Sequence, residues 1–148
     1  MHGTASLMEI PSWLKRIEDR LRAEFVPIAD ELDAIDGLRA TASSNRWGTL
    51  TGANGYAVFL SCMFRDRVPG EPDEVSLSVC FQHVDTEPTF DADVCWGGPS
   101  GYIEDEYTDH PIAYDQASID ELFFRLPGLL ESLKKAAMRG IPNDQAEQ

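Results

Sequence analysis

Positive charge is missing from the middle of this sequence. Between Val68 and Phe124 there is no lysine or arginine, although these 57 residues include fourteen acidic ones. Elsewhere the chain has twelve acidic and twelve basic residues, so the formal net charge of −14 arises within this one window. Concentrated negative potential repels nucleic acid and anionic lipid and attracts basic surfaces and cations. We therefore expect a basic partner, and neither nucleic acid nor a membrane.

Cysteine and long apolar runs are also scarce. The three cysteines, Cys62, Cys80 and Cys95, have no CxxC spacing, and an odd number of this kind indicates a reducing compartment. No stretch approaches the roughly 20 apolar residues of a membrane span. The first residues lack the charged region followed by an apolar region that marks a secretory signal. Together these absences predict a cytoplasmic protein.

Catalytic and cofactor-binding motifs are absent as well. The sequence contains no GxSxG, Walker A, GxGxxG or HExxH pattern. The glycines at 97, 98 and 101 lie in a predicted hairpin turn and not before a helix, which argues against a phosphate-binding loop. We therefore predict a non-enzymatic protein without a cofactor or a metal.

The length and the apolar pattern of the sequence predict one domain, residues 1–148, that begins and ends with a helix. Apolar residues recur at three- and four-residue steps over 12–36 and again over 118–139, where Ser118-Ile-Asp-Glu121 is a capping-box sequence. Pro27 predicts a kink or two consecutive helices in the first segment, and Pro127-Gly128 predicts a break in the second. We expect residues 1–10 and 142–148 to be flexible.

Between the helices the pattern changes to strands. A polar strand is predicted at 38–47, and alternating or apolar segments follow at 56–66, 74–85, 89–96 and 101–107. The connectors PGEP, TEP and GGPS are turn compositions, and short connectors favour antiparallel neighbours. The sequence thus predicts an α+β fold: an antiparallel meander sheet of four or five strands over 38–107, with both helices packed on one face.

The hydrophobic alternation also suggests a register, because a slip of one residue exchanges the faces of a strand. Centring the first two hairpins on their turns pairs Leu60 with Phe81, and Phe81 with Val94. The same register places Cys80 opposite Cys95 on the other face. We interpret this pair as reduced thiols, with a cross-strand disulfide or a soft-metal site as the alternatives.

Extending the register through the last turn places acidic residues opposite each other. It pairs Asp93 with Glu104 and Asp91 with Glu106, and like charges in these positions destabilise a sheet. Asp85, Asp105 and Asp109 are then expected near the same edge. A sequence that tolerates this repulsion indicates a surface kept for something cationic, whereas the simplest alternative is a solvated face that aids solubility.

These patterns predict a partner-binding surface with aromatic anchors, since aromatic residues dominate binding hot spots. The carboxylates and tyrosines assigned to it are Asp91, Asp93, Glu104, Asp105, Glu106, Asp109, Tyr102 and Tyr107. Trp96 and Phe59 are further candidate anchors. The leading hypothesis is a non-catalytic acidic protein-binding module, of the immunity or antitoxin type, that covers a basic surface of a partner protein, such as a toxin domain.

Two other functions stay open. A small metal-dependent enzyme or regulator would use the strand carboxylates with His110, since hard cations prefer oxygen ligands. A structural or secretion-chaperone-like component would form a homodimer with a hydrophobic groove. We interpret His110 itself as a solvated loop residue and His83 as a hydrogen-bonded residue near a sheet end.

Overall fold

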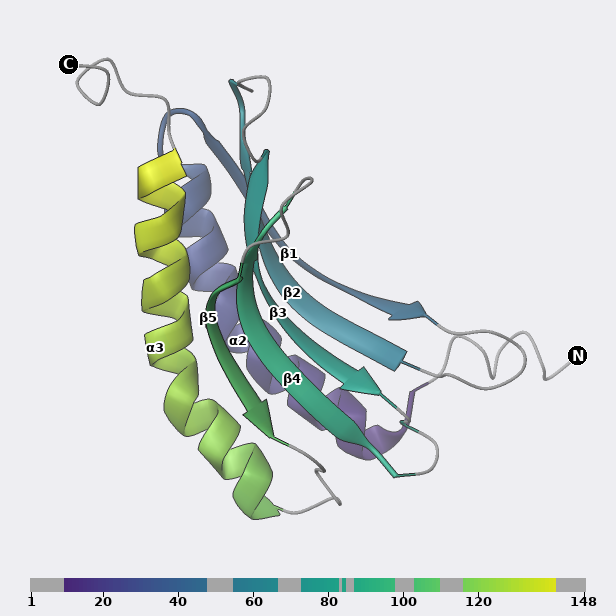
Figure 1. Ribbon diagram of the computed structural model, residues 1–148. Helices are drawn as coiled ribbons and strands as arrows, with labels where there is room; N and C mark the ends of the chain where they lie inside the picture. Colours follow the sequence, from purple (N-terminus) through teal and green to yellow (C-terminus); the bar gives the residue numbers. More distant parts are fainter. Residues whose placement is uncertain are drawn as a thin grey trace, which may run out of the picture.

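The computed structural model describes residues 10–47, 55–66, 73–82, 84, 87–97, 103–109 and 116–140. Its elements are α2 (Ser12–Asp33), β1 (Leu38–Trp47), β2 (Gly55–Phe64), β3 (Glu74–Gln82), β4 (Thr89–Trp96), β5 (Ile103–Asp109) and α3 (Gln116–Gly140). The strands form one antiparallel sheet in the order β1-β2-β3-β4-β5 (Figure 1). The predicted α+β meander with a helix at each end is confirmed, and its sheet has five strands.

Both helices are continuous, so the predicted division of α3 at Pro127-Gly128, and of α2 into two helices at Pro27, is wrong. Pro27 and Pro127 both lie on the exposed side of their helices, where the carbonyl that loses its hydrogen bond can face water. The apolar stripe continues on either side of each proline and stays buried against the sheet. This burial outweighs the roughly 3 kcal/mol by which proline disfavours a helix interior.

A tight connection joins α2 to the sheet. The helix ends at Asp33 rather than at residue 36, and Gly37 adopts a φ of 93°, which favours glycine over other residues. The Asp33 carboxylate accepts a hydrogen bond of 3.0 Å from the backbone N–H of Ala40 on β1. The first strand is thereby tied to the helix that precedes it.

The predicted register of the first two hairpins is wrong by four residues. Leu60 pairs with Leu77 rather than Phe81, and Phe81 pairs with Phe90 rather than Val94. Because four is an even number, each strand keeps the face that its alternation predicted. The observed register gives β2 and β3 the apolar pairs Tyr56–Phe81, Val58–Val79, Leu60–Leu77 and Cys62–Val75. The predicted register gave three such pairs, so cross-strand packing favours the observed one.

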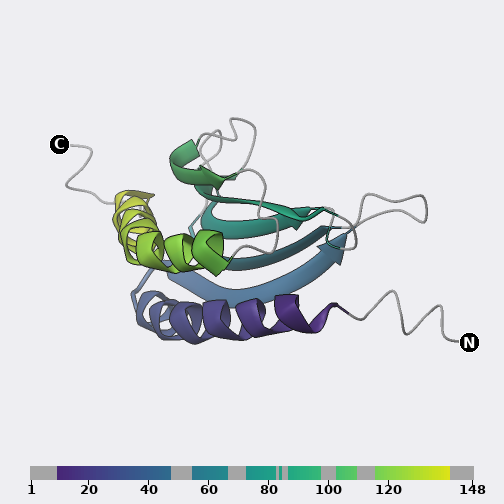
Figure 2. The same ribbon diagram turned by 90° about the horizontal axis from the view of Figure 1, so that it is seen from below.

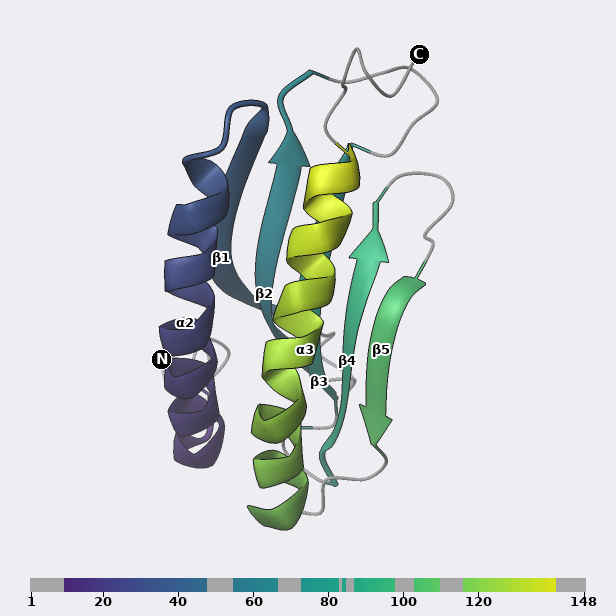
Figure 3. The same ribbon diagram turned by 90° about the vertical axis from the view of Figure 1, so that its left-hand side faces the viewer.

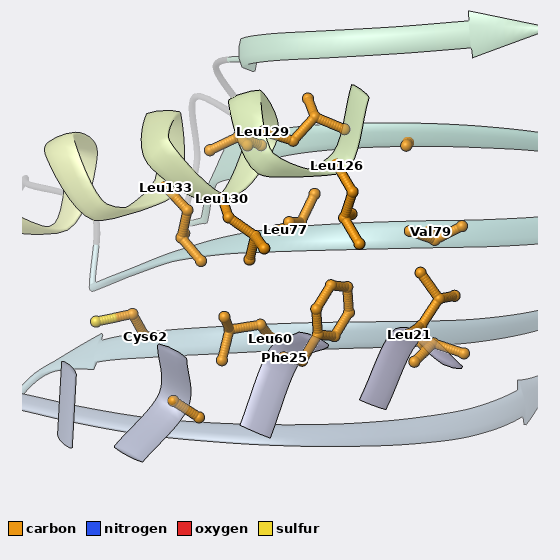
Figure 4. Packing of buried hydrophobic residues seen from close by; sticks show 14 of the residues in the cluster. Leu21, Phe25, Leu60, Cys62, Leu77, Val79, Leu126, Leu129, Leu130 and Leu133 are labelled. Carbon is orange, nitrogen blue, oxygen red and sulfur yellow. The ribbon is translucent and has the colours of Figure 1, made fainter. Parts of the chain in front are cut away.

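The core lies between the sheet and the two helices. Leu21 and Phe25 of α2 and Leu126 and Leu133 of α3 point toward Leu60 and its neighbours on the central strands (Figure 4). The two helices run side by side in the same direction on this one side of the sheet (Figure 3). Contacts between them include the guanidinium of Arg20, which lies 3.8 Å from the ring centroid of Phe123, and an ion pair of Lys134 with Glu31.

The strands bend toward the helices in their middle, so the covered face of the sheet is convex and the other face is concave (Figures 1 and 2). No helix packs on the concave face among the residues that the structure describes. We call this second face the open face. It consists of the alternate residues of each strand, whose side chains point away from the core.

Candidate functional site

The open face combines small polar, acidic and a few apolar side chains. One row across all five strands consists of Ser43, Phe59, Ser78, Asp93 and Glu106, each the direct partner of the next. The side chains become acidic toward β4 and β5. This gradient follows from the sequence, since β2 to β5 contain no lysine or arginine and most of the acidic strand residues are in β4 and β5.

Three carboxylates are brought together at the acidic end. Asp93 lies directly opposite Glu106, and Asp91 is two residues before Asp93 on the same face of β4. Burial raises the pKa of Asp93, and the negative charges of Asp91 and Glu106 raise it further. We refer to Asp91, Asp93 and Glu106 as the acidic trio.

One oxygen of the trio has no hydrogen-bond partner among the described residues. Asp91 Oδ1 is buried and accepts no hydrogen bond from the residues that the structure describes. A buried carboxylate oxygen without a donor is unfavourable, because it has lost its water. A donor from outside the chain would relieve this cost.

The predicted contact between Cys80 and Cys95 is wrong. Cys80 pairs with Asp91, and Cys95 pairs with Ser76, because of the same register shift. All three cysteines are free thiols. Burial raises the pKa of Cys80 to about 11, with Asp93 and Asp91 adding to the effect, so this thiol is a poor nucleophile at neutral pH.

The predicted acidic pairs across β4 and β5 are also wrong. Asp93 faces Glu106 rather than Glu104, and Asp91 faces Thr108 rather than Glu106. The register shifts between Val94 and Cys95, where the pairing is irregular. This irregularity moves Glu104 out of line with the acidic trio.

Three predicted site residues contact α3 instead. The contacts join Tyr107 to Arg125, Asp105 to Ser132, and Glu104 to Arg139, so every seventh residue of α3 holds one residue of β5. The Ser132 hydroxyl donates to Asp105 Oδ2 at 2.6 Å, and Arg139 lies 2.6 Å from Glu104 Oε1. These residues fasten the edge strand to the helix.

Two of these β5 residues are further committed to internal contacts. The indole N–H of Trp96 donates to Glu104 at 3.0 Å, and this bond, together with Arg139, holds the pKa of Glu104 below its usual range. The Tyr107 ring packs against the core, 5.8 Å from the ring of Phe90. Trp96 also packs against the core. Of the predicted carboxylates, the acidic trio therefore remains on the open face.

Some predicted residues lie outside the description. Asp109 ends β5, but its side chain is not described, and Tyr102, His83, Asp85 and His110 fall outside the described residues. The two terminal segments expected to be flexible, 1–10 and 142–148, also lie outside it, except for Ile10. These expectations stay predictions.

A polar cluster on the covered side was missed by the sequence reasoning. Glu18 of α2 is buried and accepts hydrogen bonds from the hydroxyls of Ser44 and Tyr56. The signal was present, because Glu18 falls between Ile17 and Leu21 in the apolar stripe. We interpret the cluster as a structural connection between the helix and the first two strands.

Neither a cluster of metal-ligating residues nor a membrane-spanning helix is found in the described part of the chain. Within the ranges given above, no group of three or more His, Cys, Asp or Glu residues is arranged to hold a metal ion. The alternative of a metal-dependent enzyme relied on His110, which is not described, and stays a prediction. Neither described helix is long and apolar enough to cross a membrane.

No family model, no curated protein and no solved structure matches the chain.

Proposed function

We propose that the protein is a non-catalytic binding module whose open face covers a basic surface of a partner protein. An immunity or antitoxin protein that neutralises a basic toxin domain is the class that fits best. The observation that carries the proposal is the acidic trio. Asp93 and Glu106 lie directly opposite each other beside Asp91, on a face that no described helix covers.

The trio is unfavourable in the free protein. Like charges on opposite strands repel each other, and the buried Asp91 Oδ1 receives no donor from the described part of the chain. Lysine or arginine side chains of a partner would supply both the missing positive charge and the missing hydrogen bond. The binding of a basic surface therefore turns an internal cost into a favourable contact.

Apolar side chains on the same face supply candidate anchors. Met63 and Ile103 are each 47% exposed, and Phe59 is the β2 residue of the row that ends with Asp93 and Glu106. A face with an acidic end and apolar residues beside it matches the composition of protein interfaces better than a uniformly charged one. Charge would then govern the rate of association and the apolar contacts the lifetime of the complex.

The distribution of positive charge supports the same orientation. The two helices carry eight basic and nine acidic residues, so their charges nearly cancel, and they lie on the convex side of the sheet. The two sides of the molecule therefore differ in potential. A basic partner is directed to the open face and away from the helices.

The test starts with capture of the partner from the source cell at low salt, followed by purification and measurement of the association rate. The triple variant Asp91→Asn, Asp93→Asn, Glu106→Gln is compared with a control that neutralises Glu24, Asp30 and Asp36, near or on α2. Both variants change the net charge by the same amount. We expect at least a tenfold slower association for the first and little change for the control.

An equal effect of both triples would mean that only the net charge matters, and the open face would lose its assigned role. Unchanged association by the first triple would contradict the proposal outright. Raising the salt should reduce the difference between the wild type and the first triple, because screening weakens the exposed part of the attraction.

A further inference from the structure

A large apolar side chain stands exposed on the outer side of α3. Phe124 is 81% exposed, whereas the ring of its neighbour Phe123 is partly buried and covered by the guanidinium of Arg20. Phenylalanine is among the residues whose burial contributes most to interfaces. This residue contributes little to the core of its own chain.

The next turn of the same helix contains an unfavourable pair of residues, Pro127 and Gly128. In a helix interior, glycine disfavours the helix by about 1 kcal/mol relative to alanine and proline by about 3 kcal/mol. A Cβ atom at Gly128 would meet nothing within 4 Å, so the packing of this chain does not require glycine there. The pair leaves bare backbone beside an exposed phenylalanine.

We propose that one exposed side of α3, the stripe of Phe124, Pro127, Gly128 and Glu131, binds the same stripe of a second copy of the chain. The copies would be antiparallel, related by a two-fold axis between Pro127 and Gly128. Phe124 of one copy then lies over the bare backbone at Gly128 and the stem of Glu131 of the other. A two-fold interface needs such self-complementarity, in which each copy supplies both the protrusion and the depression.

Charge complementarity supports this alignment. The stripe extends to Asp120 toward the start of the helix and to Lys135 toward its end. The spacing of these residues places them on the same side of the helix as Phe124. The proposed axis places Asp120 of each copy against Lys135 of the other, which gives two ion pairs. Over its whole length α3 has four basic and three acidic residues, so two copies meet here without the repulsion that their net charge of −14 implies.

The inference is independent of the proposed function, because α3 packs on the side of the sheet opposite to the open face. A dimer built through α3 would leave both acidic trios accessible. It would therefore present two binding faces to basic partners. Failure of either proposal leaves the other standing.

Sedimentation velocity over a concentration series tests the inference, with the full chain throughout. We expect a monomer–dimer equilibrium for the wild type and a dissociation constant at least tenfold higher for Phe124→Ser. The matched control is Val26→Ser, which removes an exposed apolar side chain (43% exposed) from α2. It should leave the equilibrium unchanged.

Two further sets of variants test the geometry. Gly128→Leu fills the space above the backbone with a good helix former, so it should abolish the dimer without lowering the melting temperature of the monomer. Asp120→Lys and Lys135→Asp should each weaken the dimer, and the double variant should recover much of the loss. A wild type that stays monomeric at every concentration, or a dimer that survives Gly128→Leu, would overturn the inference. Equal weakening by Val26→Ser would do the same.

Discussion

Glu18 of α2 and Tyr56 of β2 are joined across the interface between helix and sheet, where the tyrosine hydroxyl donates a hydrogen bond of 2.5 Å to Glu18 Oε2. The same oxygen accepts a bond from Ser44, and Lys15 lies 3.1 Å from the other oxygen. Glu18 is 5% exposed and is the one charged residue buried among the described ones. The surrounding donors replace the water that this carboxylate loses on folding.

Removal of one donor should therefore destabilise the fold. We expect Tyr56→Phe to lower the free energy of unfolding by about 1–3 kcal/mol, because it leaves the buried carboxylate short of a hydrogen bond. In a Glu18→Leu background the same change should lose most of its effect, since no carboxylate then needs the hydroxyl. Urea unfolding of the four proteins measures this coupling. Equal losses in both backgrounds would show that the hydroxyl acts independently of Glu18.

The same cluster predicts a loss of stability in acid. Burial raises the pKa of Glu18, but the hydrogen bonds from Ser44, Tyr56 and Lys15 outweigh it, so the pKa in the folded protein lies below the ordinary 4.5. The resulting stabilisation is complete well above pH 4.5 and disappears as the pH falls through the pKa of the folded state. The advantage of the wild type over Glu18→Gln in urea unfolding should shrink over this range. An advantage independent of pH would contradict the assignment.

Asp93 should behave in the opposite way. Its pKa is raised in the folded protein, so its ionisation as the pH rises past 3.8 destabilises the fold. We expect Asp93→Asn to raise the free energy of unfolding at pH 7 by about 0.2–1 kcal/mol, through relief of the cross-strand repulsion. The gain should vanish below pH 3.8, where Asp93 of the wild type is protonated and therefore as neutral as the asparagine of the variant. Asp30→Asn, on the exposed side of α2, is the control and should show no comparable gain.

The thiol of Cys80 reports on the same charges. Its pKa of about 11 results from burial and then from Asp93 and Asp91, so neutralising Asp93 should lower it. We expect iodoacetamide to modify Cys80 several-fold faster in Asp93→Asn than in the wild type, because the thiolate is the reactive form. Cys62 is the internal control, since its pKa of about 11 results from burial and from Asp33. Mass spectrometry of the two peptides over time distinguishes the sites.

Two glycines of α3 should respond in opposite directions to the same substitution. Gly128→Ala should raise the free energy of unfolding of the monomer by about 1 kcal/mol, because alanine favours the helix and its Cβ meets nothing. Gly140→Ala should lower it by about 1–3 kcal/mol, because its Cβ would lie 2.1 Å from the Phe64 ring. That ring is buried and stacked on Trp96, so it has little room to move. Urea unfolding at low protein concentration checks both signs.

The two helices show where local patterns predict well and where they fail. The apolar stripes of α2 and α3 located both helices to within three residues at each end. The breaks predicted at Pro27 and at Pro127 did not form, because each proline lies on the exposed side of a helix held by its buried face. Whether a proline divides a helix depends on this packing, which the spacing of residues does not reveal.

For the candidate site, too, the sequence predicted one part correctly and left another part undecided. The absence of lysine and arginine between Val68 and Phe124 correctly placed the negative charge on the last strands. It did not distinguish Glu106, which faces Asp93, from Glu104, which pairs with Arg139 of α3. That distinction depends on an irregular pairing at Val94 and Cys95 and on Arg139, which lies 35 residues after Glu104 in the chain.

The sequence by itself determined the α+β meander, the face of each core strand and the region of excess negative charge. These are consequences of short-range periodicity, which is the same for every register that differs by an even number of residues. The tertiary structure alone decided which acidic residues gather on the open face. It did so because the number of apolar cross-strand pairs and the contacts of β5 with α3 select one register among those that the alternation permits.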